Sequence, residues 1–290
     1  MKCLVIGNNG QVATALSQVC RKGLEVVRIG RPEIDLLNPK DFAKKFLKFS
    51  PDIIINPAAY TSVDQAEEES EMAFAVNMEG SGAVAAAAKE IGVPCIYLST
   101  DYVFDGSGDI PICEESTPRP LNVYGKSKLA GEAKVISCMD NYVILRTAWV
   151  YSMFGKNFLR SMLQATKDRH QVDVVCDQFG TPTSASQIAI AIIDIAYNLI
   201  KNSDMSLRGI FHMTASDGPI SWADFAENIF LISQERGGKP VRIRRILTSQ
   251  YPVKACRPMY SCLDCSKLTR VHNIRISSWK DEIRHVIPQF

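Results

Sequence analysis

The sequence predicts an α/β protein in which a doubly wound parallel sheet is followed by a smaller C-terminal lobe. In the first half of the chain, short runs rich in Ile, Val and Leu alternate with longer segments of helical periodicity. The runs are apolar on both faces, which is typical of parallel strands covered by helices on both sides. A glycine-containing turn directly follows the first run, at the place where such sheets bind ligands.

The expected elements of the first half follow from this alternation. Right-handed crossovers between parallel strands would place the helices on both faces of the sheet. The apolar runs predict strands at residues 2–6, 24–29, 52–55, 94–98 and 142–145. Helical periodicity predicts helices at residues 11–20, 39–49, 70–91 and 124–136.

The regular alternation of strands and helices ends after Val150. The pattern there predicts helices at residues 157–169, 184–200, 222–234 and 279–287, and strands at 172–176, 209–213 and 241–246. This shift divides the chain into a first domain, residues 1–152, and a C-terminal lobe, residues 153–290. We expect segments of 170–215 to return to the first domain.

The charge balance excludes several classes of protein. The chain of 290 residues carries 33 basic and 31 acidic side chains. The formal charge of +2 gives no strong positive electrostatic potential that would attract nucleic acid or an anionic membrane surface. The first residues contain too short an apolar run for a signal peptide. The most apolar segment, residues 188–200, falls short of the roughly 20 residues that span a bilayer. We therefore expect a cytoplasmic protein without nucleic-acid or membrane partners.

The cysteines point to a reducing compartment. There are nine, an odd number scattered along the whole chain, which indicates free thiols rather than a disulfide framework. Cys262 and Cys265 have C-x-x-C spacing, but a zinc site needs further ligands, and only His272 follows within ten residues. We expect no metal site, and the role of the Cys262/Cys265 pair stays open.

The first turn has the form of a dinucleotide-binding loop. Gly7 and Gly10 follow the first expected strand, and Gln11, Val12 and Ala13 open the first helix in the sequence GNNGQVA. Gly7 allows a tight turn, and Gly10 lets the backbone approach a pyrophosphate at the helix N-terminus. The spacing is G-x-x-G-x-x-A, and its strand–turn–helix setting predicts a Rossmann-type cofactor site.

The end of the second expected strand indicates which dinucleotide binds. An acidic residue that would bind a ribose 2′-hydroxyl is missing there, and the chain reads Ile29, Gly30, Arg31, Pro32. The Arg31 guanidinium would suit a 2′-phosphate, which favours NADPH. NADH stays open, because Arg31 is also compatible with an ordinary exposed loop.

A tyrosine and a lysine at the start of one expected helix are the predicted general acid and its partner. Tyr124 and Lys128 are four residues apart and share a helical face. A neighbouring ammonium would lower the pKa of the phenol, so that Tyr124 protonates a carbonyl oxygen while hydride reaches the carbon. Thr100 follows a strand whose carboxyl end should meet the same crevice, where its hydroxyl would hydrogen-bond the developing alkoxide.

Motifs in chain order along nearly the whole sequence resemble those of the dTDP-4-dehydrorhamnose reductases, which are extended short-chain dehydrogenase/reductases. The resemblance continues weakly through RPMYS at residues 257–261. The main motifs are GNNGQV at 7–12, NPAAYTSVD at 56–64, STDYVFDG at 99–106, LNVYGKSKLAGE at 121–132, RTAWVY at 146–151 and DQFGTPT at 177–183.

The resemblance implies a role for each matching residue. It makes Tyr124 the proton donor, Lys128 its pKa partner and ribose ligand, and Thr100 the hydroxyl that tunes the substrate carbonyl, with Asp101 and Trp149 at substrate-contacting positions. The implied reaction is NAD(P)H-dependent reduction of the 4-keto group of dTDP-4-dehydro-L-rhamnose to dTDP-L-rhamnose. The implied cofactor-lining residues are Gly10, Gln11, Val12, Asp35, Leu36, Ala58, Ala59 and Tyr60.

The sequence departs from this family at its metal positions. Some members hold magnesium between subunits through glutamates, one in the first helix and one after the Gly-x-Pro-Thr motif. Here these places read Thr14-Ala15-Leu16 and Ser184-Ala185-Ser186, which offer no carboxylate. We therefore expect a monomer or a metal-independent homodimer.

Other functions share these motifs. One is reduction of a different 4-keto sugar nucleotide. A second is an epimerase or dehydratase that keeps NAD⁺ bound, although Thr100, Asp101 and Tyr102 lack the following glutamate that dehydratases commonly add. A third is a non-catalytic subunit that binds NADP and a partner enzyme, which would not need the proton-transfer residues.

Overall fold

A six-stranded parallel sheet forms the centre of the protein, and its α/β architecture confirms the predicted fold class. The computed structural model describes residues 1–287, apart from the side chains of Thr166 and Asp168. Every pairing in this sheet is parallel. Its strands are β1 (Lys2–Ile6), β2 (Glu25–Ile29), β3 (Ile53–Asn56), β4 (Cys95–Thr100), β5 (Tyr142–Thr147) and β10 (Gly209–His212).

The strand order creates a crevice beside β1. Across the sheet the order is β10-β5-β4-β3-β1-β2, so the chain leaves β1 toward one edge and then returns to build the other side from β3. The connections therefore diverge at the carboxyl ends of β1 and β3. Doubly wound sheets bind ligands at such a switch point.

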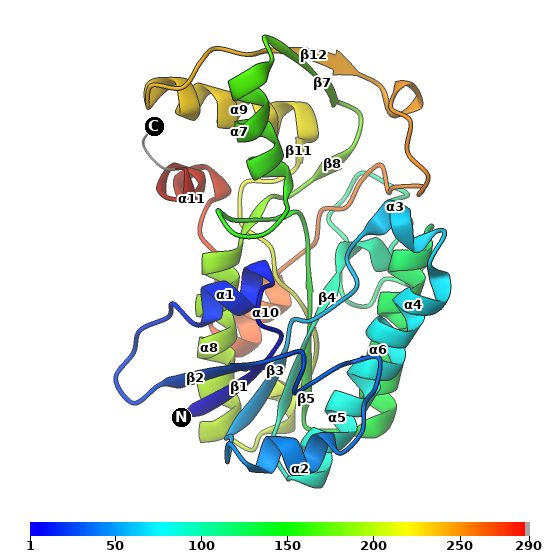
Figure 1. The fold of residues 1–290 in the computed structure, drawn as a ribbon, viewed down its shortest axis with the longest axis vertical. Coiled ribbons are helices and arrows are strands. Elements are labelled where there is room, and N and C mark those ends of the chain that lie inside the picture. Colours follow the sequence, from blue (N-terminus) through cyan, green and yellow to red (C-terminus); the bar gives the residue numbers. More distant parts are fainter. Residues whose placement is uncertain (288–290) are drawn as a thin grey trace.

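Helices cover both faces of the sheet (Figure 1). Alternate residues of each strand point to opposite faces, so Cys3 and Val5 pack on one side and Leu4 and Ile6 on the other. Both faces are apolar, as the continuous apolar runs predict. The first face is covered by α1 (Gln11–Leu16) and α8 (Ala185–Lys201), and the second by α2 (Phe42–Leu47), α5 (Ser81–Glu90) and α6 (Val123–Cys138).

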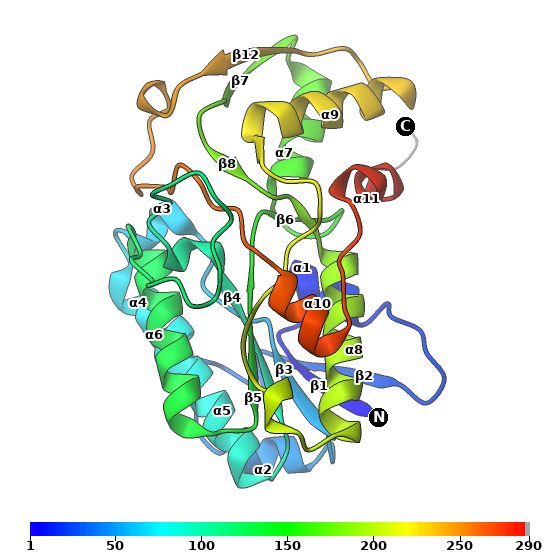
Figure 2. The same ribbon diagram turned by 180° about the vertical axis from the view of Figure 1, so that it is seen from behind.

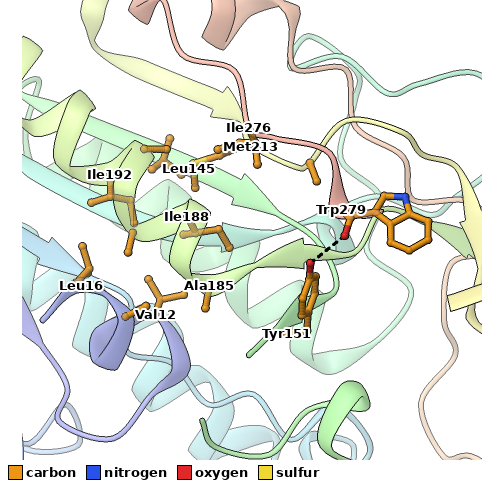
Figure 3. Packing of buried hydrophobic residues seen from close by; sticks show 14 of the residues in the cluster. Val12, Leu16, Leu145, Tyr151, Ala185, Ile188, Ile192, Met213, Ile276 and Trp279 are labelled. Atoms are coloured by element: carbon orange, nitrogen blue, oxygen red, sulfur yellow. Dashed lines mark hydrogen bonds between the residues drawn. The ribbon is translucent and has the colours of Figure 1, made fainter. Parts of the chain in front are cut away.

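The core beneath α8 extends into the C-terminal part of the chain. Figure 3 shows Val12 of α1 lying against Ala185 and Ile188 of α8. In the same cluster the Tyr151 hydroxyl donates a 3.4 Å hydrogen bond to the Trp279 carbonyl oxygen. One continuous core therefore joins the sheet to α11 (Trp279–Val286).

The helix expected at residues 70–91 contains an irregular turn. The chain runs through α4 (Ser70–Phe74), a π-helical turn (Ala75–Gly80) and then α5. Asn77 in this turn binds Tyr60, whose backbone N–H donates to Asn77 Oδ1 at 2.8 Å, and Asn77 Nδ2 donates to Ser127 Oγ of α6 at 2.9 Å. Periodicity predicts the helix but not the extra residue in the turn.

A small lobe that includes α7, α9, β7 and β12 lies at the top of Figure 1, whereas α10 lies beside α8 in the lower half of Figure 2. Strand β7 pairs with β12 there, whereas α8 and β10 pack in the central unit. No helix within residues 1–287 is long and apolar enough to cross a membrane. The further elements are α3 (Val63–Ala66), β6 (Val150–Tyr151), α7 (Phe158–Asp168), β7 (Gln171–Val175), β8 (Phe179–Gly180), β9 (Thr183–Ser184), β11 (Ile220–Ser221), α9 (Trp222–Glu235), β12 (Arg242–Ile246), α10 (Ser266–His272) and α11 (Trp279–Val286).

We expect Gly131→Ala to destabilise the protein, because α6 crosses the π-helical turn without room for a methyl group. A Cβ at Gly131 would lie 2.2 Å from the Asn77 carbonyl oxygen and 2.5 Å from the Tyr97 hydroxyl. The overpacking should lower the free energy of unfolding by about 1–3 kcal/mol, measured by urea denaturation. Ala133→Ser on the exposed side of α6 is the matched control. Unchanged or increased stability of Gly131→Ala would contradict the close packing.

Candidate active site

The main cleft opens at the carboxyl ends of the parallel strands. It has a volume of ≈ 690 Å³ and is lined by the glycine turn, the ends of β3 and β4 and the start of α6. Phe158 and Trp222 of the small lobe form part of its wall. The cleft therefore lies between the sheet and the small lobe, at the switch point beside β1.

The glycine turn forms one side of this cleft. Gly7 has a φ of +111°, a conformation that favours glycine, and its N–H donates to the Ile29 carbonyl at 2.7 Å. Gly10 has open space where a Cβ would stand. The Gln11 side chain accepts hydrogen bonds from Ser152 Oγ and Asn157 Nδ2, both at 2.8 Å, and so holds the segment after β6 beside the turn.

A second cavity, of ≈ 500 Å³, continues from the turn toward the end of β2. It shares Gly7, Ala58 and Ala59 with the main cleft, so the two cavities adjoin. Together they are lined by all the residues expected to bind the cofactor. Those of the main cleft are Gly7, Gly10, Gln11, Val12, Ala58, Ala59, Tyr124 and Lys128; those of the second cavity are Gly7, Arg31, Asp35, Leu36, Ala58, Ala59 and Tyr60.

Arg31 forms an ion pair at the second cavity. Its Nε lies 3.0 Å from Asp35 Oδ1, which also accepts the Leu37 backbone N–H at 3.0 Å. The Leu37 hydrogen bond and then Arg31 hold the pKa of Asp35 below its usual value. The strand end lacks a carboxylate in sequence, yet the following loop brings one to the same cavity. The cavity thus offers both a guanidinium and a carboxylate to a ligand.

Tyr124 and Thr100 meet on the floor of the main cleft, and their side chains are within hydrogen-bonding contact. The Thr100 hydroxyl donates to Asp101 Oδ1 at 3.0 Å and accepts the Tyr102 backbone N–H at 3.2 Å. The Tyr102 ring contacts Tyr124 edge-on, with ring centroids 5.8 Å apart. These contacts fix the Tyr124 phenol beside the Thr100 hydroxyl.

The expected lowering of the Tyr124 pKa by Lys128 is not what the structure shows. Desolvation raises the pKa of Tyr124 to about 12. The contact with Thr100 lowers this pKa, and the negative charge of Asp101 raises it further. Lys128 Nζ instead donates to the Leu98 carbonyl at 2.7 Å. The phenol therefore keeps its proton throughout the neutral pH range, as a proton donor must. Sequence spacing could not reveal this, because desolvation depends on tertiary packing.

Asp101 is almost completely buried at the same end of β4. Burial raises its pKa to about 7, against the opposing hydrogen bonds from Ser261 and Thr100. Its Oδ2 atom makes no hydrogen bond within the described part of the chain. A buried polar atom without a partner is costly, which favours the neutral form of this carboxyl group.

Trp149 lines the main cleft and stacks on Trp222 of α9. The ring centroids are 3.4 Å apart and the planes differ by 5°. Trp149 has a left-handed φ of +46°, and Gly180 leaves the space that its ring occupies. The sequence predicts Trp149 by its motif but gives no signal for Trp222 or Phe158, which reach the cleft only through the packing of the small lobe.

Residues 256 and 257 link the small lobe to α3 and α6. Arg257 pairs with Asp64 of α3 at 2.6 Å. Asn122 caps α6 by accepting the Gly125 N–H at 2.8 Å, and its Nδ2 donates to the Cys256 carbonyl at 2.7 Å. The helix that carries Tyr124 is therefore anchored to the small lobe at its first turn.

The Cys262 and Cys265 thiols each contact a threonine. Cys262 Sγ lies 3.3 Å from Thr181 Oγ1, and Cys265 Sγ accepts the Thr214 backbone N–H at 3.2 Å. Burial raises the pKa of both thiols. Within the described residues no group of three or more His, Cys, Asp or Glu side chains could hold a metal ion.

The doubly wound sheet and the paired cavities at its switch point place the protein among the Rossmann-type nucleotide-binding enzymes. The family model of the RmlD substrate binding domain matches residues 1–290, and the chain belongs to this family. This result confirms the resemblance found in the motifs.

Named relatives match over nearly the whole chain. A dTDP-4-dehydrorhamnose reductase of Sinorhizobium fredii is 45% identical, over 99% of this chain and 97% of the relative. A crystal structure of such a reductase from Clostridium acetobutylicum has a TM-score of 0.89 at 35% identity, covering 99% of this chain and 98% of its own. One from Bacillus anthracis, in complex with NADP, has a TM-score of 0.90 at 31% identity, covering 98% of each chain.

We expect Gly180→Ala to break the stack of Trp149 on Trp222, because the added Cβ would lie 2.4 Å from the Trp149 ring. Stacked indoles give an exciton couplet in the far-ultraviolet circular dichroism spectrum, and the variant should lose most of it. Trp222→Phe is the reference for complete loss, since the chain has only three tryptophans. A wild-type couplet in Gly180→Ala would show that Gly180 does not position the ring.

Proposed function

We propose that the protein catalyses NADPH-dependent reduction of the 4-keto group of dTDP-4-dehydro-L-rhamnose to dTDP-L-rhamnose. The observation that carries this proposal is the Tyr124 phenol beside Thr100, on the floor of a cleft that adjoins a second cavity containing Arg31. The reductases that match this chain end to end support the choice of substrate.

The two adjoining cavities fit a dinucleotide. Gly10 leaves space for the pyrophosphate, Arg31 would bind the 2′-phosphate, and Lys128 would hold a ribose. Asp35, Leu36 and Tyr60 would line the adenosine end. The nicotinamide, when bound, supplies hydride to the substrate carbon.

The residues on the floor of the cleft would handle the proton. Tyr124 donates its phenolic proton to the carbonyl oxygen as the carbon receives hydride, which converts the ketone to an alcohol and leaves a phenolate. Thr100 hydrogen-bonds the same oxygen and keeps it beside Tyr124. The Lys128 ammonium, four residues along α6, stabilises the phenolate until a proton returns.

The small lobe would bind the substrate. We propose that residues 1–152 mainly carry the cofactor and residues 153–290 mainly the substrate, with α8 and β10 supporting the sheet. Asp101 lines the cleft beside Thr100, and the stacked Trp149 offers an apolar wall. We further propose that the protein acts in the cytoplasm as a monomer or a metal-independent homodimer, because Ala15 and Ala185 are buried and cannot ligate a cation.

The direct test follows reduced-cofactor absorbance with dTDP-4-dehydrorhamnose. The reductase proposal expects stoichiometric oxidation of NADPH, whereas an epimerase returns its hydride and a non-catalytic subunit transfers none. Absence of net oxidation with both NADPH and NADH would exclude the reductase.

We expect Tyr124→Phe to lower kcat by about 10²–10⁴-fold, the usual contribution of a general acid, because the ring remains and the proton is lost. The Kd for NADPH, measured by fluorescence titration, should change little. Tyr142→Phe is the matched control, since Tyr142 begins β5 at the edge far from the cleft. Wild-type turnover in Tyr124→Phe would remove Tyr124 from the acid role.

We expect Arg31→Ala to weaken NADPH binding about tenfold or more while leaving NADH binding nearly unchanged. A hydrogen bond to a charged group contributes about 1.5–3 kcal/mol, and only NADPH carries the phosphate that Arg31 would bind. The Kd of each nucleotide measures the effect, and Lys40→Ala in the exposed part of the same loop serves as control. Equal losses for both nucleotides would assign Arg31 another role.

A further inference from the structure

A buried ion pair lies beneath the proposed proton-transfer residues. Glu132 of α6 and Arg146 of β5 are each 2% exposed. Arg146 Nε donates to Glu132 Oε1 at 2.9 Å, and Nη2 donates to Oε2 at 2.7 Å. Ser99 Oγ of β4 adds a third hydrogen bond, to Glu132 Oε1 at 2.6 Å. The carboxylate is therefore held in one orientation by two strands.

The pair belongs to a polar row that crosses the sheet. Ser99, Arg146 and His212 occupy matching register positions on β4, β5 and β10. Arg146 Nη1 lies 3.5 Å from His212 Nε2, and His212 Nδ1 lies 2.9 Å from the Ile112 carbonyl oxygen. Burial and then the charge of Arg146 lower the pKa of His212 to about 3, so this histidine is neutral and does not compete for Glu132.

Glu132 is also the charged neighbour of Lys128. Tyr124, Lys128 and Glu132 follow at intervals of four on α6, and residues at this spacing share one helical face. Lys128 is 1% exposed, donates to the Leu98 carbonyl and lies 4.1 Å from the centre of the Tyr97 ring.

The charges around Lys128 come from several elements. Burial lowers the pKa of Lys128 to about 7, and the negative charge of Glu132 opposes that effect. The Tyr97 phenol of β4 lies beside Lys128 and is neutral, and Asp101 follows Thr100 at the end of the same strand. From β5 it presents Arg146, whose charge is engaged by Glu132. Within the described residues, Glu132 is the carboxylate whose charge acts on Lys128.

We propose that Glu132, oriented by Arg146 and Ser99, is a positioning residue that keeps Lys128 charged and directed into the cleft. The inference rests on the proposed function, because it gives Lys128 its part in stabilising the Tyr124 phenolate. Two hydrogen bonds from the Arg146 guanidinium and one from Ser99 hold the Glu132 carboxylate in place where no solvent reaches it. The ion pair thereby supplies a fixed negative charge one helical turn from Lys128.

The test measures the protonation of Lys128 directly. Lysine labelled with ¹³C at Cε is followed by NMR against pH, and the Lys128 signal is the one that Lys128→Arg removes. The wild-type midpoint is expected near the value of about 7 that burial produces. Glu132→Gln should lower it by about 1 to 3 pH units, the effect of losing an opposite charge at short range. The alkaline limb of kcat/KM for NADPH oxidation should move to lower pH in the same direction.

A second variant covers the risk that Glu132→Gln does not fold, since it leaves Arg146 buried without a partner. The double variant Glu132→Gln/Arg146→Met removes both charges and should still lower the Lys128 midpoint. Glu79→Gln is the matched control, because Glu79 pairs with exposed Lys134 on the other side of α6 and should leave the midpoint unchanged.

The outcomes separate this inference from the proposed function. A Lys128 midpoint equal to the wild-type value in folded Glu132→Gln or in the double variant overturns the inference, as does failure of both variants to fold, which would assign the pair to the core alone. Absence of NADPH oxidation by the wild-type protein defeats the proposed function instead, and the NMR titration does not depend on that result.

Discussion

The ion pair between Arg146 and Glu132 fixes how α6 lies on the sheet, and the floor of the cleft is positioned through α6. The helix packs so closely that Gly125 and Gly131 face backbone carbonyls, of Tyr102 and Asn77 respectively, where no side chain would fit. Removing one partner of a charged pair at such a contact strongly destabilises the fold, because the other charge remains buried and uncompensated. Close packing and the ion pair together allow one position of the helix relative to β4, and hence one position of Tyr124 beside Thr100.

Much of this arrangement could be predicted from the sequence, because it depends on local signals. The apolar runs identify the strands of the central sheet, and the glycine turn after β1 identifies the main cleft, where we propose that the cofactor binds. The missing parts depend on contacts between distant segments. Trp222 joins Trp149 only through packing of α9, and Phe158 reaches the cleft only through packing of α7. The spacing of Tyr124 and Lys128 indicates a shared helical face, but the pKa of each is governed by burial, which a linear pattern does not contain.

The two parts of the molecule meet around the cleft through contacts of different kinds. On one side, Arg257 and Asp64 form an ion pair, and the Asn122 amide binds the Cys256 carbonyl. On the other, Trp222 of α9 stacks on Trp149, and Phe158 of α7 packs against Trp222. Polar contacts at one edge and stacked rings at the other give the cleft one hydrophilic and one apolar boundary. Such a division suits a ligand that has phosphates and hydroxyls on one part and a flat ring on another.

The π-helical turn at Ala75–Gly80 has a consequence for how the chain tolerates insertions and deletions. Each residue of a regular helix advances the chain by about 100°, so removing one residue from this turn would rotate either α4 or α5 by that amount relative to the other. Val84 and Ala88 would then leave the core, or Asn77 would lose Tyr60 and Ser127. At this segment the number of residues, rather than the identity of any side chain, allows Asn77 to keep its hydrogen bonds while Val84 and Ala88 stay in the core.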